Sequence, residues 1–248
     1  MLRLLWGVRV TVQDDVRERE LCRIFNLQWS REHQRDGTDA SFKIVSKGRT
    51  IEIPVEVKST TGDTVSTARD VGMSHIKKWR SHFWIIGFYT KSRDPDLIKT
   101  LCLTPDDIEP WVASIEQKIL PDFSLANHAS RRLRMEDLYV ICGQKEYYTI
   151  DDAKLLYKQQ WSKSQYQEAL DSEFSGKQVI SPEKMLSILK LRSTYIAQRG
   201  ATLNNPHVTS GFLKSFLRTD RLINDDWAHN LREIAKNYVL ANPNHPFV

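Results

Sequence analysis

The chain has 248 residues, of which 40% are hydrophobic and 27% are charged, and its formal net charge is +5 at pH 7. This length suits one large domain or two small ones, and the composition is that of a globular protein, not a disordered one. The basic charge favours a polyanionic partner without requiring one. No apolar run approaches the length of a membrane span, so no membrane segment is expected.

The cysteines are few and far apart, and no paired Cys or His spacing accompanies Cys22, Cys102 and Cys142. Neither a disulfide framework nor a zinc site is indicated, and each thiol is expected to pack as a small buried hydrophobe. A reducing cytoplasm fits this usage. The apolar opening, residues 1–8, is too short for a signal peptide and is expected to form an edge strand or a packing arm.

The first helix is predicted between Asp14 and Trp29, where apolar residues recur at helical spacing among Arg and Glu residues. Asp14 or Asp15 is the expected N-cap. We expect this helix to lie against a sheet. The polar segment that follows, residues 30–36, is expected to be a loop.

A hairpin is predicted next, with strands at residues 36–44 and 51–58 and a turn at residues 47–49. Both strands are rich in β-branched and aromatic residues, and the break between them is polar and contains glycine. Because side chains alternate along a strand, Glu56 and Lys58 share one face of the second strand. A carboxylate and an ammonium placed in this way are groups that a phosphodiesterase needs to hold Mg²⁺ and position water.

Asp39 and the sequence Glu56-Val57-Lys58 resemble the metal-dependent nuclease superfamily named PD-(D/E)XK, to which most type II restriction endonucleases belong. The match is local, and Thr38 stands where the motif's name has a proline. Asp36 competes with Asp39, but Asp36-Gly37 is typical of a turn, whereas Asp39 opens an alternating run. The alternative is an exposed hairpin that carries a solvated ion pair.

The resemblance implies an α/β fold for residues 1–149, a restriction-endonuclease-like mixed β-sheet core flanked by helices. It also implies that Asp39, Glu56 and the Val57 backbone carbonyl hold one or two Mg²⁺ ions. Lys58 would hold the attacking water and help to deprotonate it. A lysine between a metal ion and an apolar sheet can have its pKa lowered by like charge and desolvation.

Further candidates stand on the neighbouring helices. In the nucleases that this chain resembles, the helix before the hairpin often offers another carboxylate, and Glu20 or Glu18 is available for that role. The helix predicted at residues 74–82 contains Lys77 and Lys78, which we expect to contact the DNA backbone. For both helices the alternative is a solvated face.

The apolar run at residues 83–89 predicts a buried strand, and residues 97–103 predict another. Strand, helix and buried strand in this order indicate a parallel crossover unit after the Glu56 strand. Thr104 as cap and Pro105 in the first turn predict the start of a helix that continues through residues 108–120.

Arginines are concentrated after that helix, at Arg131, Arg132 and Arg134. We expect them to reach DNA phosphates or guanine edges, which Arg reads bidentately. A surface loop without a ligand is the alternative. A further strand is predicted at residues 138–142.

The C-terminal part, residues 150–248, has helical periodicity and is expected to be a mainly helical subdomain. It could read DNA, form a dimer interface or cover the sheet. Cationic and aromatic residues are interleaved there, which is consistent with a DNA-facing surface, and a charge-balanced helical bundle is the alternative. The cations are Lys190, Arg192, Arg199, Lys214, Arg218 and Arg221, and the aromatic residues are Tyr195, His207 and Phe216. The predicted helices are residues 150–161, 165–174, 182–198, 212–217 and 227–240.

Together these features predict a Mg²⁺-dependent, sequence-specific endonuclease of double-stranded DNA, similar to type II restriction enzymes. It would act as a homodimer, because two-fold DNA sites are matched by two-fold proteins, and it would need no organic cofactor. Two alternatives remain open. One is a repair or structure-selective nuclease of the same superfamily, and the other is a non-catalytic nucleic-acid-binding module.

Overall fold

The computed structural model describes residues 13–29 and 37–248, with side chains from residue 16 onward in the first helix. The chain forms two compact units, one of Met1–Gln117 with Leu203–Val248 and one of Lys118–Thr202. This division differs from the boundary expected between residues 149 and 150. The helical unit begins earlier, and the last part of the chain returns to the sheet.

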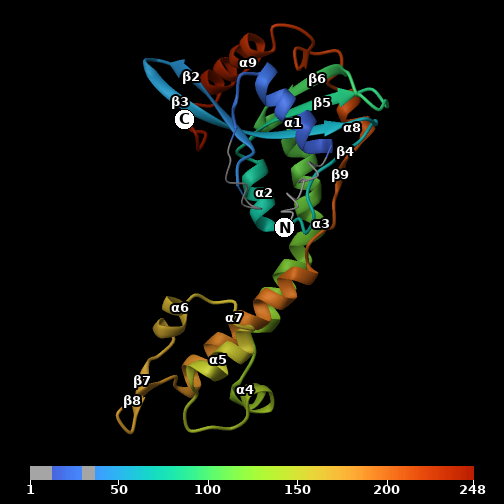
Figure 1. Cartoon of the computed structure of the whole chain (residues 1–248). Coiled ribbons are helices and arrows are strands. Elements are labelled where there is room, and N and C mark those ends of the chain that lie inside the picture. The colour runs from blue at the N-terminus through green and yellow to red at the C-terminus, as the bar shows by residue number, and fades with distance from the viewer. Residues whose placement is uncertain (1–12, 30–36) are drawn as a thin grey trace, which may run out of the picture. The chain divides into compact units, whose positions relative to one another are not determined.

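A mixed six-stranded sheet is the centre of the first unit, in the order β1-β2-β3-β5-β6-β10 (Figure 1). β3 and β5 are parallel, as expected for the crossover, and the other neighbours are antiparallel. The mixed α/β class is therefore confirmed. The strands are β1 Gln28–Trp29, β2 Ala40–Ser46, β3 Arg49–Thr60, β5 Phe83–Tyr89, β6 Leu97–Leu103 and β10 Leu222–Ile223.

The predicted hairpin is formed by β2 and β3, which pair from Ala40↔Val55 to Ser46↔Arg49. Lys47 and Gly48 make the turn, both with positive φ (48° and 73°). Two such residues match the right-handed twist of the strands they connect, and a glycine accepts this conformation at no steric cost. The strand register that brings the candidate residues together is thus fixed by a tight turn.

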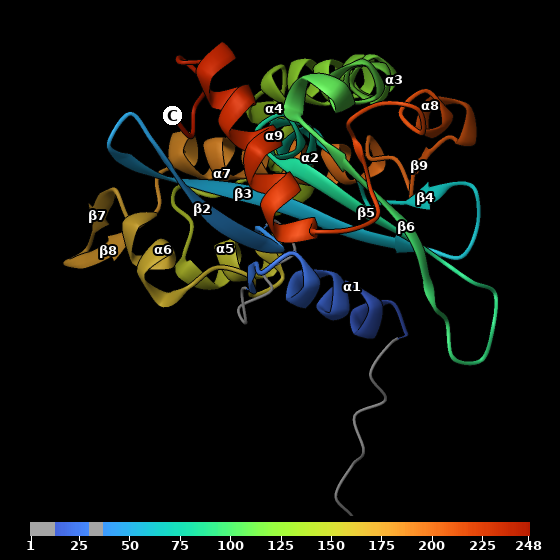
Figure 2. The same ribbon diagram turned by 90° about the horizontal axis from the view of Figure 1, so that it is seen from above.

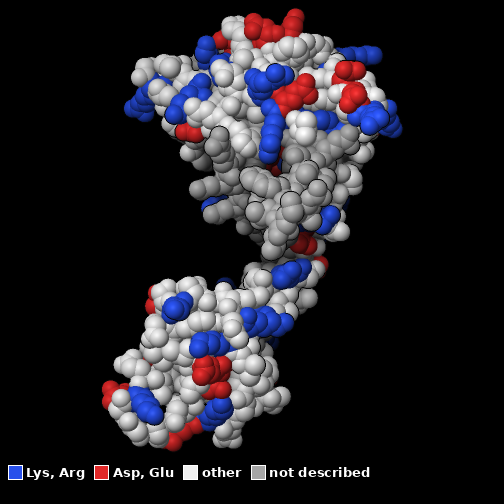
Figure 3. Space-filling model, in the orientation of Figure 1, with Lys and Arg blue, Asp and Glu red and all other residues white. Residues whose placement is uncertain are grey.

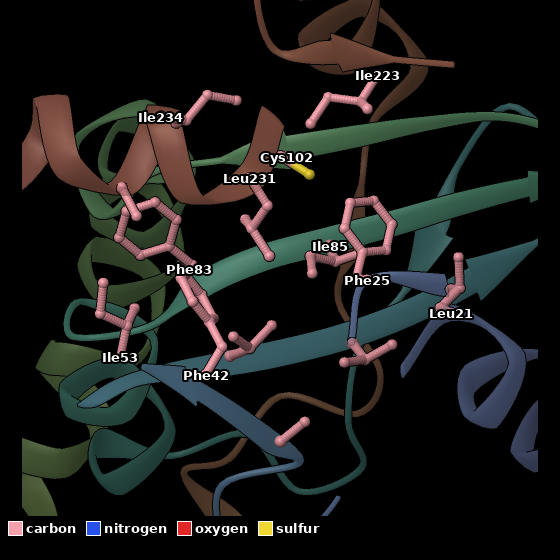
Figure 4. Packing of buried hydrophobic residues seen from close by; sticks show 14 of the residues in the cluster. Leu21, Phe25, Phe42, Ile53, Phe83, Ile85, Cys102, Ile223, Leu231 and Ile234 are labelled. Carbon is pink, nitrogen blue, oxygen red and sulfur yellow. The ribbon is translucent and has the colours of Figure 1, made fainter. Parts of the chain in front are cut away.

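One face of the sheet is covered by α1 (Gln13–Ile24) and α9 (Trp227–Ala241), as Figures 1 and 2 show. The alternating apolar residues of β3 point to this face and pack in a core with Leu21, Phe42 and Phe83 (Figure 4). Gly87 allows α1 to approach β5, because a Cβ there would lie 2.8 Å from a methyl carbon of Leu21. Removing apolar area from water on this face is the main stabilising contribution to the unit.

α1 is shorter than predicted, since it ends at Ile24 and the chain continues into β1 instead of remaining helical to Trp29. Asn26 adopts a left-handed conformation (φ 51°), which terminates the helix. Arg232 of α9 donates from Nη1 to the Phe25 carbonyl at 3.2 Å and from Nη2 to the Asn26 carbonyl at 2.9 Å. A distant side chain therefore caps the end of α1, and no local pattern could reveal it.

The opposite face is covered by α2 (Met73–Trp79) and by the first part of α3 (Pro105–Arg131). Trp79, Trp84 and Trp111, one from each of α2, β5 and α3, pack edge to face or tilted, with ring centroids 5.2 to 5.7 Å apart. Such aromatic pairs add directional contacts to the burial of large side chains. They hold α2, the helix that follows the candidate motif, firmly under the sheet.

α3 continues well beyond the predicted end at residue 120, although Pro121 has no N–H to donate to the Gln117 carbonyl. Phe123 and Ala126 are buried on the part of the helix that follows the proline, so packing compensates for the missing hydrogen bond. The division between the two units falls inside α3, between Gln117 and Lys118, one helical turn before Pro121.

The helical unit has its own core around Tyr148, Ile180 and Met185. The strand predicted at residues 138–142 is wrong, because this run lies in a helix that begins after the Arg134 N-cap, where Asp137 accepts from the Arg134 amide at 2.7 Å. A short apolar run does not by itself distinguish strand from helix. The elements are α4 Met135–Cys142, α5 Ile150–Tyr157, α6 Lys163–Glu168, the hairpin β7 Ser172–Phe174 and β8 Lys177–Val179, and α7 Pro182–Gly200.

The chain then returns to the sheet unit. β9 (His207–Val208) pairs with β4 (Val65–Ser66), and α8 (Ser210–Lys214) follows. β10 pairs with β6 and forms the edge of the sheet, and α9 packs on β2. Of the three roles considered for the C-terminal helices, α9 therefore has that of covering the sheet. The predicted helices at residues 212–217 and 227–240 correspond to α8 and α9.

Cys22 and Cys102 are buried, as expected, and Cys142 is half-buried. Burial raises the pKa of Cys22 to about 12, so this thiol is protonated at neutral pH. Over the described ranges, no helix combines the length and apolar character needed to cross a membrane. The opening residues 1–8, the N-cap candidates Asp14 and Asp15, the loop at 30–36 and the competing ligand Asp36 fall outside the described side chains.

Candidate functional site

The hairpin register places the motif residues next to one another. Ala40 pairs with Val55, so Asp39, which immediately precedes β2, lies beside Glu56 on β3. Alternation along β3 buries Val55 and Val57 in the core and turns Glu56 and Lys58 to the opposite face. The proximity of the three predicted residues is therefore a direct consequence of strand pairing.

Three oxygen atoms converge on the Lys58 ammonium. Its Nζ lies 3.1 Å from Asp39 Oδ2, 2.9 Å from Glu56 Oε1 and 3.0 Å from the Val57 carbonyl oxygen. The same Asp39 Oδ2 accepts a hydrogen bond from the Val57 amide at 3.1 Å, which fixes the carboxylate against β3. The oxygens proposed as metal ligands thus already surround one cationic centre.

Lys78 is a second cation of this cluster. Its Nζ lies 2.6 Å from Glu56 Oε2 and donates to the Gly37 carbonyl at 3.1 Å. Apart from this ion pair, Oε2 has no hydrogen-bond partner among the described residues. Lys78 was expected on a DNA-facing helix surface, but it is largely buried in the site, while the neighbouring Lys77 is exposed. The contact that either lysine makes with DNA stays a prediction.

The electrostatics of the cluster stabilise its charged form. Glu56 is only 2% exposed, and burial alone would raise the pKa of its carboxyl, but Lys58 and Lys78 outweigh burial and hold it well below its usual range. For Lys58, burial opposes the charge, yet Glu56, Asp39 and Glu18 raise the pKa of the ammonium above its ordinary value. In the surroundings that the protein itself provides, Lys58 is therefore protonated at neutral pH. A lowered pKa would require a second positive charge beside it.

The turn before Asp39 is held from the opposite side of the site. His82 is buried, its Nε2 lies 3.1 Å from Thr38 Oγ1, and its Nδ1 lies 2.6 Å from the Lys78 carbonyl oxygen. A carbonyl can only accept, so Nδ1 carries the proton and Nε2 accepts from the threonine hydroxyl. Burial lowers the pKa of His82, which keeps the ring in this neutral form. His82 therefore positions the backbone that carries Asp39.

The helix before the hairpin contributes differently than expected. Glu20 accepts a hydrogen bond from the Tyr89 hydroxyl at 3.1 Å, so it is engaged with β5. Glu18 is the carboxylate of α1 whose charge acts on Lys58. Of the two acidic candidates, Glu18 thus has the closer electrostatic connection to the cluster.

Arg131, Arg132 and Arg134 belong to the helical unit, at the end of α3 and before α4, and all three side chains are exposed. Exposure leaves their guanidinium groups available to an external anion. Their expected role in DNA binding stays a prediction.

The donor set suits a hard divalent cation. Mg²⁺ prefers oxygen ligands, and proteins usually supply one or two carboxylates while water and substrate complete the octahedron. Asp39, Glu56 and the Val57 carbonyl would hold the ion, since these oxygens already converge on the positive charge of Lys58. In the described part of the chain, no group of three or more His, Cys, Asp or Glu side chains is placed to hold a metal ion, so the two carboxylates of this site would need backbone and water oxygens to complete the coordination.

The sequence predicted that Asp39, Glu56 and Lys58 lie together and that Lys78 contacts the DNA backbone, but it did not predict that Lys78 pairs with Glu56 or that His82 belongs to the cluster. The sequence contained a weak signal for Lys78, because this residue lies on the crossover helix that connects the Glu56 strand to the next buried strand. His82 had none, since it stands in an ordinary polar turn before a buried strand. Comparison with known protein families and with curated protein sequences finds no match to this chain.

Proposed function

We propose that this protein is a Mg²⁺-dependent phosphodiesterase that cleaves double-stranded DNA, in the manner of the site-specific endonucleases that its motif resembles. One observation carries the proposal: Asp39, Glu56 and the Val57 carbonyl direct three oxygen atoms at a single cationic point on one face of a mixed sheet. The net charge of +5 supports a polyanionic substrate. A homodimer on a two-fold DNA site is part of this proposal.

The bound ion would polarise the scissile phosphate and neutralise the charge that develops on its oxygens. The protein's own part is to hold that ion with Asp39, Glu56 and the Val57 carbonyl. Lys58 must then leave the point on which these oxygens converge, and its ammonium can bind the attacking water or a phosphate oxygen. Lys78, which is paired with Glu56 Oε2, would keep the buried carboxylate charged when Lys58 withdraws.

The chemistry is hydrolysis of a phosphodiester. The oxygen of water forms a bond to phosphorus and gives up one proton to solvent, the bond from phosphorus to the leaving oxygen breaks, and that oxygen takes up one proton. Lys58 in its charged form positions water and has a proton to give, so it acts as a positioning cation unless a neighbouring positive charge lowers its pKa.

One observation favours the non-catalytic alternative. Both oxygens of Glu56 already face lysines, so the cluster is balanced without any ligand and could serve only to join β3 to α2. A structural ion pair of this kind would tolerate EDTA and would not require Lys58 for any reaction.

The test is incubation of the purified chain with a mixed-sequence plasmid, with Mg²⁺ or with excess EDTA. Discrete fragments that form only with Mg²⁺ are the expected result. A Mg²⁺-dependent smear would support phosphodiesterase activity but contradict sequence specificity, and it would favour a repair or structure-selective nuclease. Intact plasmid under all conditions would favour the binding module.

A further inference from the structure

Arg192, on α7 in the helical unit, is a buried cation in an aromatic setting. Only 6% of the residue is exposed. Its guanidinium carbon lies 5.5 Å from the centre of the Tyr157 ring and 5.3 Å from that of Tyr195, and Nη1 donates to Gln160 Oε1 at 3.1 Å. Contact with two rings and an amide fixes the plane of the guanidinium.

The charge of Arg192 is not balanced locally. No ion pair between described residues includes it, whereas a buried cation is normally paired because removing it from water is costly. The Tyr157 hydroxyl does not supply a negative charge, because burial raises the pKa of that phenol above its ordinary value. The counter-ion is therefore expected from outside the chain.

The guanidinium also retains free donors. Nε and Nη2 of Arg192 make no hydrogen bond to any described residue, and neither is among the unpartnered side-chain nitrogens that are shut off from solvent. Each of these two nitrogens therefore reaches solvent, although most of the side chain is covered. A planar edge of N–H groups matches the oxygens of a phosphate.

Arg192 shares a face of α7 with Tyr195 and Arg199, because Tyr195 follows Arg192 by three residues and Arg199 follows Tyr195 by four. The Arg199 guanidinium carbon lies 5.9 Å from the centre of the Tyr195 ring, so one half-exposed tyrosine supports both arginines. We call these three residues the α7 arginine face. From Lys184 to its end, α7 contains no Asp or Glu, so no acidic residue of the helix itself lies beside this face. Figure 3 shows Lys and Arg atoms along this part of the unit.

The other side of α7 is attached to α3. Ser130 Oγ donates to Ser193 Oγ at 3.2 Å, and Gln198 Nε2 donates to Asn127 Oδ1 at 2.9 Å. These contacts fix the rotation of α7 about its axis. The α7 arginine face is consequently held in place before any ligand arrives.

We propose that the α7 arginine face binds backbone phosphates of a nucleic acid. Residues 192 and 199 are separated by about 10 Å along the helix axis, and their guanidinium carbons lie 5.3 Å and 5.9 Å from the centre of the same Tyr195 ring, so the face presents two neighbouring cations. A nucleic-acid strand carries a charge every ~3.4 Å of its axis and can satisfy both arginines. That the nucleic acid is double-stranded DNA rests on the proposed function; the phosphate-binding role of the face does not.

The test measures binding of the full chain to a short fluorescent DNA duplex by anisotropy, over a salt series without divalent cations. Arg199→Ala should lower the affinity about tenfold and reduce the salt slope by about 1, because one phosphate contact is lost. Arg192→Lys should also lower the affinity about tenfold but leave the slope nearly unchanged, since the charge stays while the planar fork is lost. Lys177→Ala, an exposed cation on β8, is the matched control and should bind as the wild type does.

Equal affinity of Arg199→Ala, Arg192→Lys and the Lys177→Ala control would overturn the proposal. Arg199 is exposed, so its variant is expected to fold even if Arg192→Lys does not. Binding to anionic lipid vesicles but not to the duplex would overturn it as well. The plasmid assay separates this proposal from the proposed nuclease. If the wild type cleaves no plasmid but the arginine variants bind the duplex more weakly, the α7 arginine face is supported and the nuclease is refuted. If the wild type cleaves plasmid and the variants bind as it does, the nuclease is supported and the α7 arginine face is refuted.

Discussion

The buried charges of the two units differ: those of the sheet unit are paired with opposite charges, and that of Arg192 in the helical unit is not paired with any described residue. In the sheet unit Asp39 and Glu56 are matched by Lys58 and Lys78, so the cluster is balanced. In the helical unit Arg192 is covered by aromatic rings and an amide and meets no carboxylate among the described residues. In the proposed function, a metal ion would take the place of the Lys58 ammonium in this balanced cluster. An unbalanced guanidinium leaves its charge for an external anion.

The largest effect is expected in the balanced cluster, where the proposed function places the chemistry. Lys58→Ala should lower kcat for DNA cleavage by at least about 100-fold, because the cation that positions water is gone. Duplex affinity measured in Ca²⁺, which occupies oxygen sites with looser geometry, should change little. Glu56→Gln should be equally inactive. Cleavage rates and anisotropy on the same preparations check both statements.

Glu52→Ala is the matched control for these variants. Glu52 lies on the same strand and is exposed, and it accepts a hydrogen bond from Ser41 at 2.6 Å outside the cluster. Its removal should leave the cleavage rate within about twofold of wild type. An inactive Glu52→Ala variant, or an active Lys58→Ala variant, would show that the site was assigned to the wrong residues.

Adjacent lysines on α2 offer a sharp test of charge balance. Lys78→Met should reduce the free energy of unfolding by about 3 kcal/mol, because it removes a partner from the buried carboxylate of Glu56. Lys77→Met, one residue away and exposed, should change it by less than about 0.5 kcal/mol. Urea denaturation of both variants measures the difference. Equal stabilities would mean that Glu56 does not depend on Lys78.

The exposed arginines of the helical unit should affect binding and not chemistry. Alanine at Arg131, Arg132 or Arg134 should weaken duplex binding and reduce its salt dependence if a phosphate contact is lost. Loss of a base contact would instead cost about 1–3 kcal/mol of sequence discrimination. Anisotropy with cognate and scrambled duplexes separates the two. Unchanged duplex affinity in all three variants would show that residues 131–134 are not part of the DNA interface.

The smallest effect concerns pH. Burial lowers the pKa of His82 below its ordinary value of 6.5, so the unfolded chain takes up a proton at a higher pH than the folded protein does. This contribution to stability is present above about pH 6.5 and is lost as the pH falls below it, by about 1 kcal/mol per pH unit. His82→Gln should flatten thermal stability between pH 7.5 and 5.5 relative to the exposed control His128→Gln. Part of the dependence should remain, because burial also lowers the pKa of His245.

Local pattern was sufficient to predict the parts of the fold that depend on neighbouring residues. Alternation along residues 51–58 and the tight turn at Gly48 predict both the hairpin and the shared face of Glu56 and Lys58. The buried strands at residues 83–89 and 97–103 are continuous apolar runs, and they coincide with β5 and β6. In each case the signal lies within a few residues of the element that it specifies.

Features set by long-range packing could not be predicted in this way. The return of β10 and α9 to the sheet depends on pairing with residues far away in the sequence, and the strand expected at residues 138–142 failed because its apolar run is too short. Burial of Lys78 and Arg192 depends on how α2 and α7 pack. A lysine or arginine on a helix reads the same in sequence whether it faces solvent or a site.

The central claim is that Asp39, Glu56 and the Val57 carbonyl form a metal site whose place Lys58 now holds. Diffraction from crystals soaked in Mn²⁺, with anomalous scattering at the manganese edge, tests it most directly. The expected result is an anomalous peak within ligand distance of those three oxygens, with Lys58 Nζ withdrawn from the point on which they converge. Lys58 still bonded to all three oxygens, with no peak beside them at a saturating Mn²⁺ concentration, would contradict the claim.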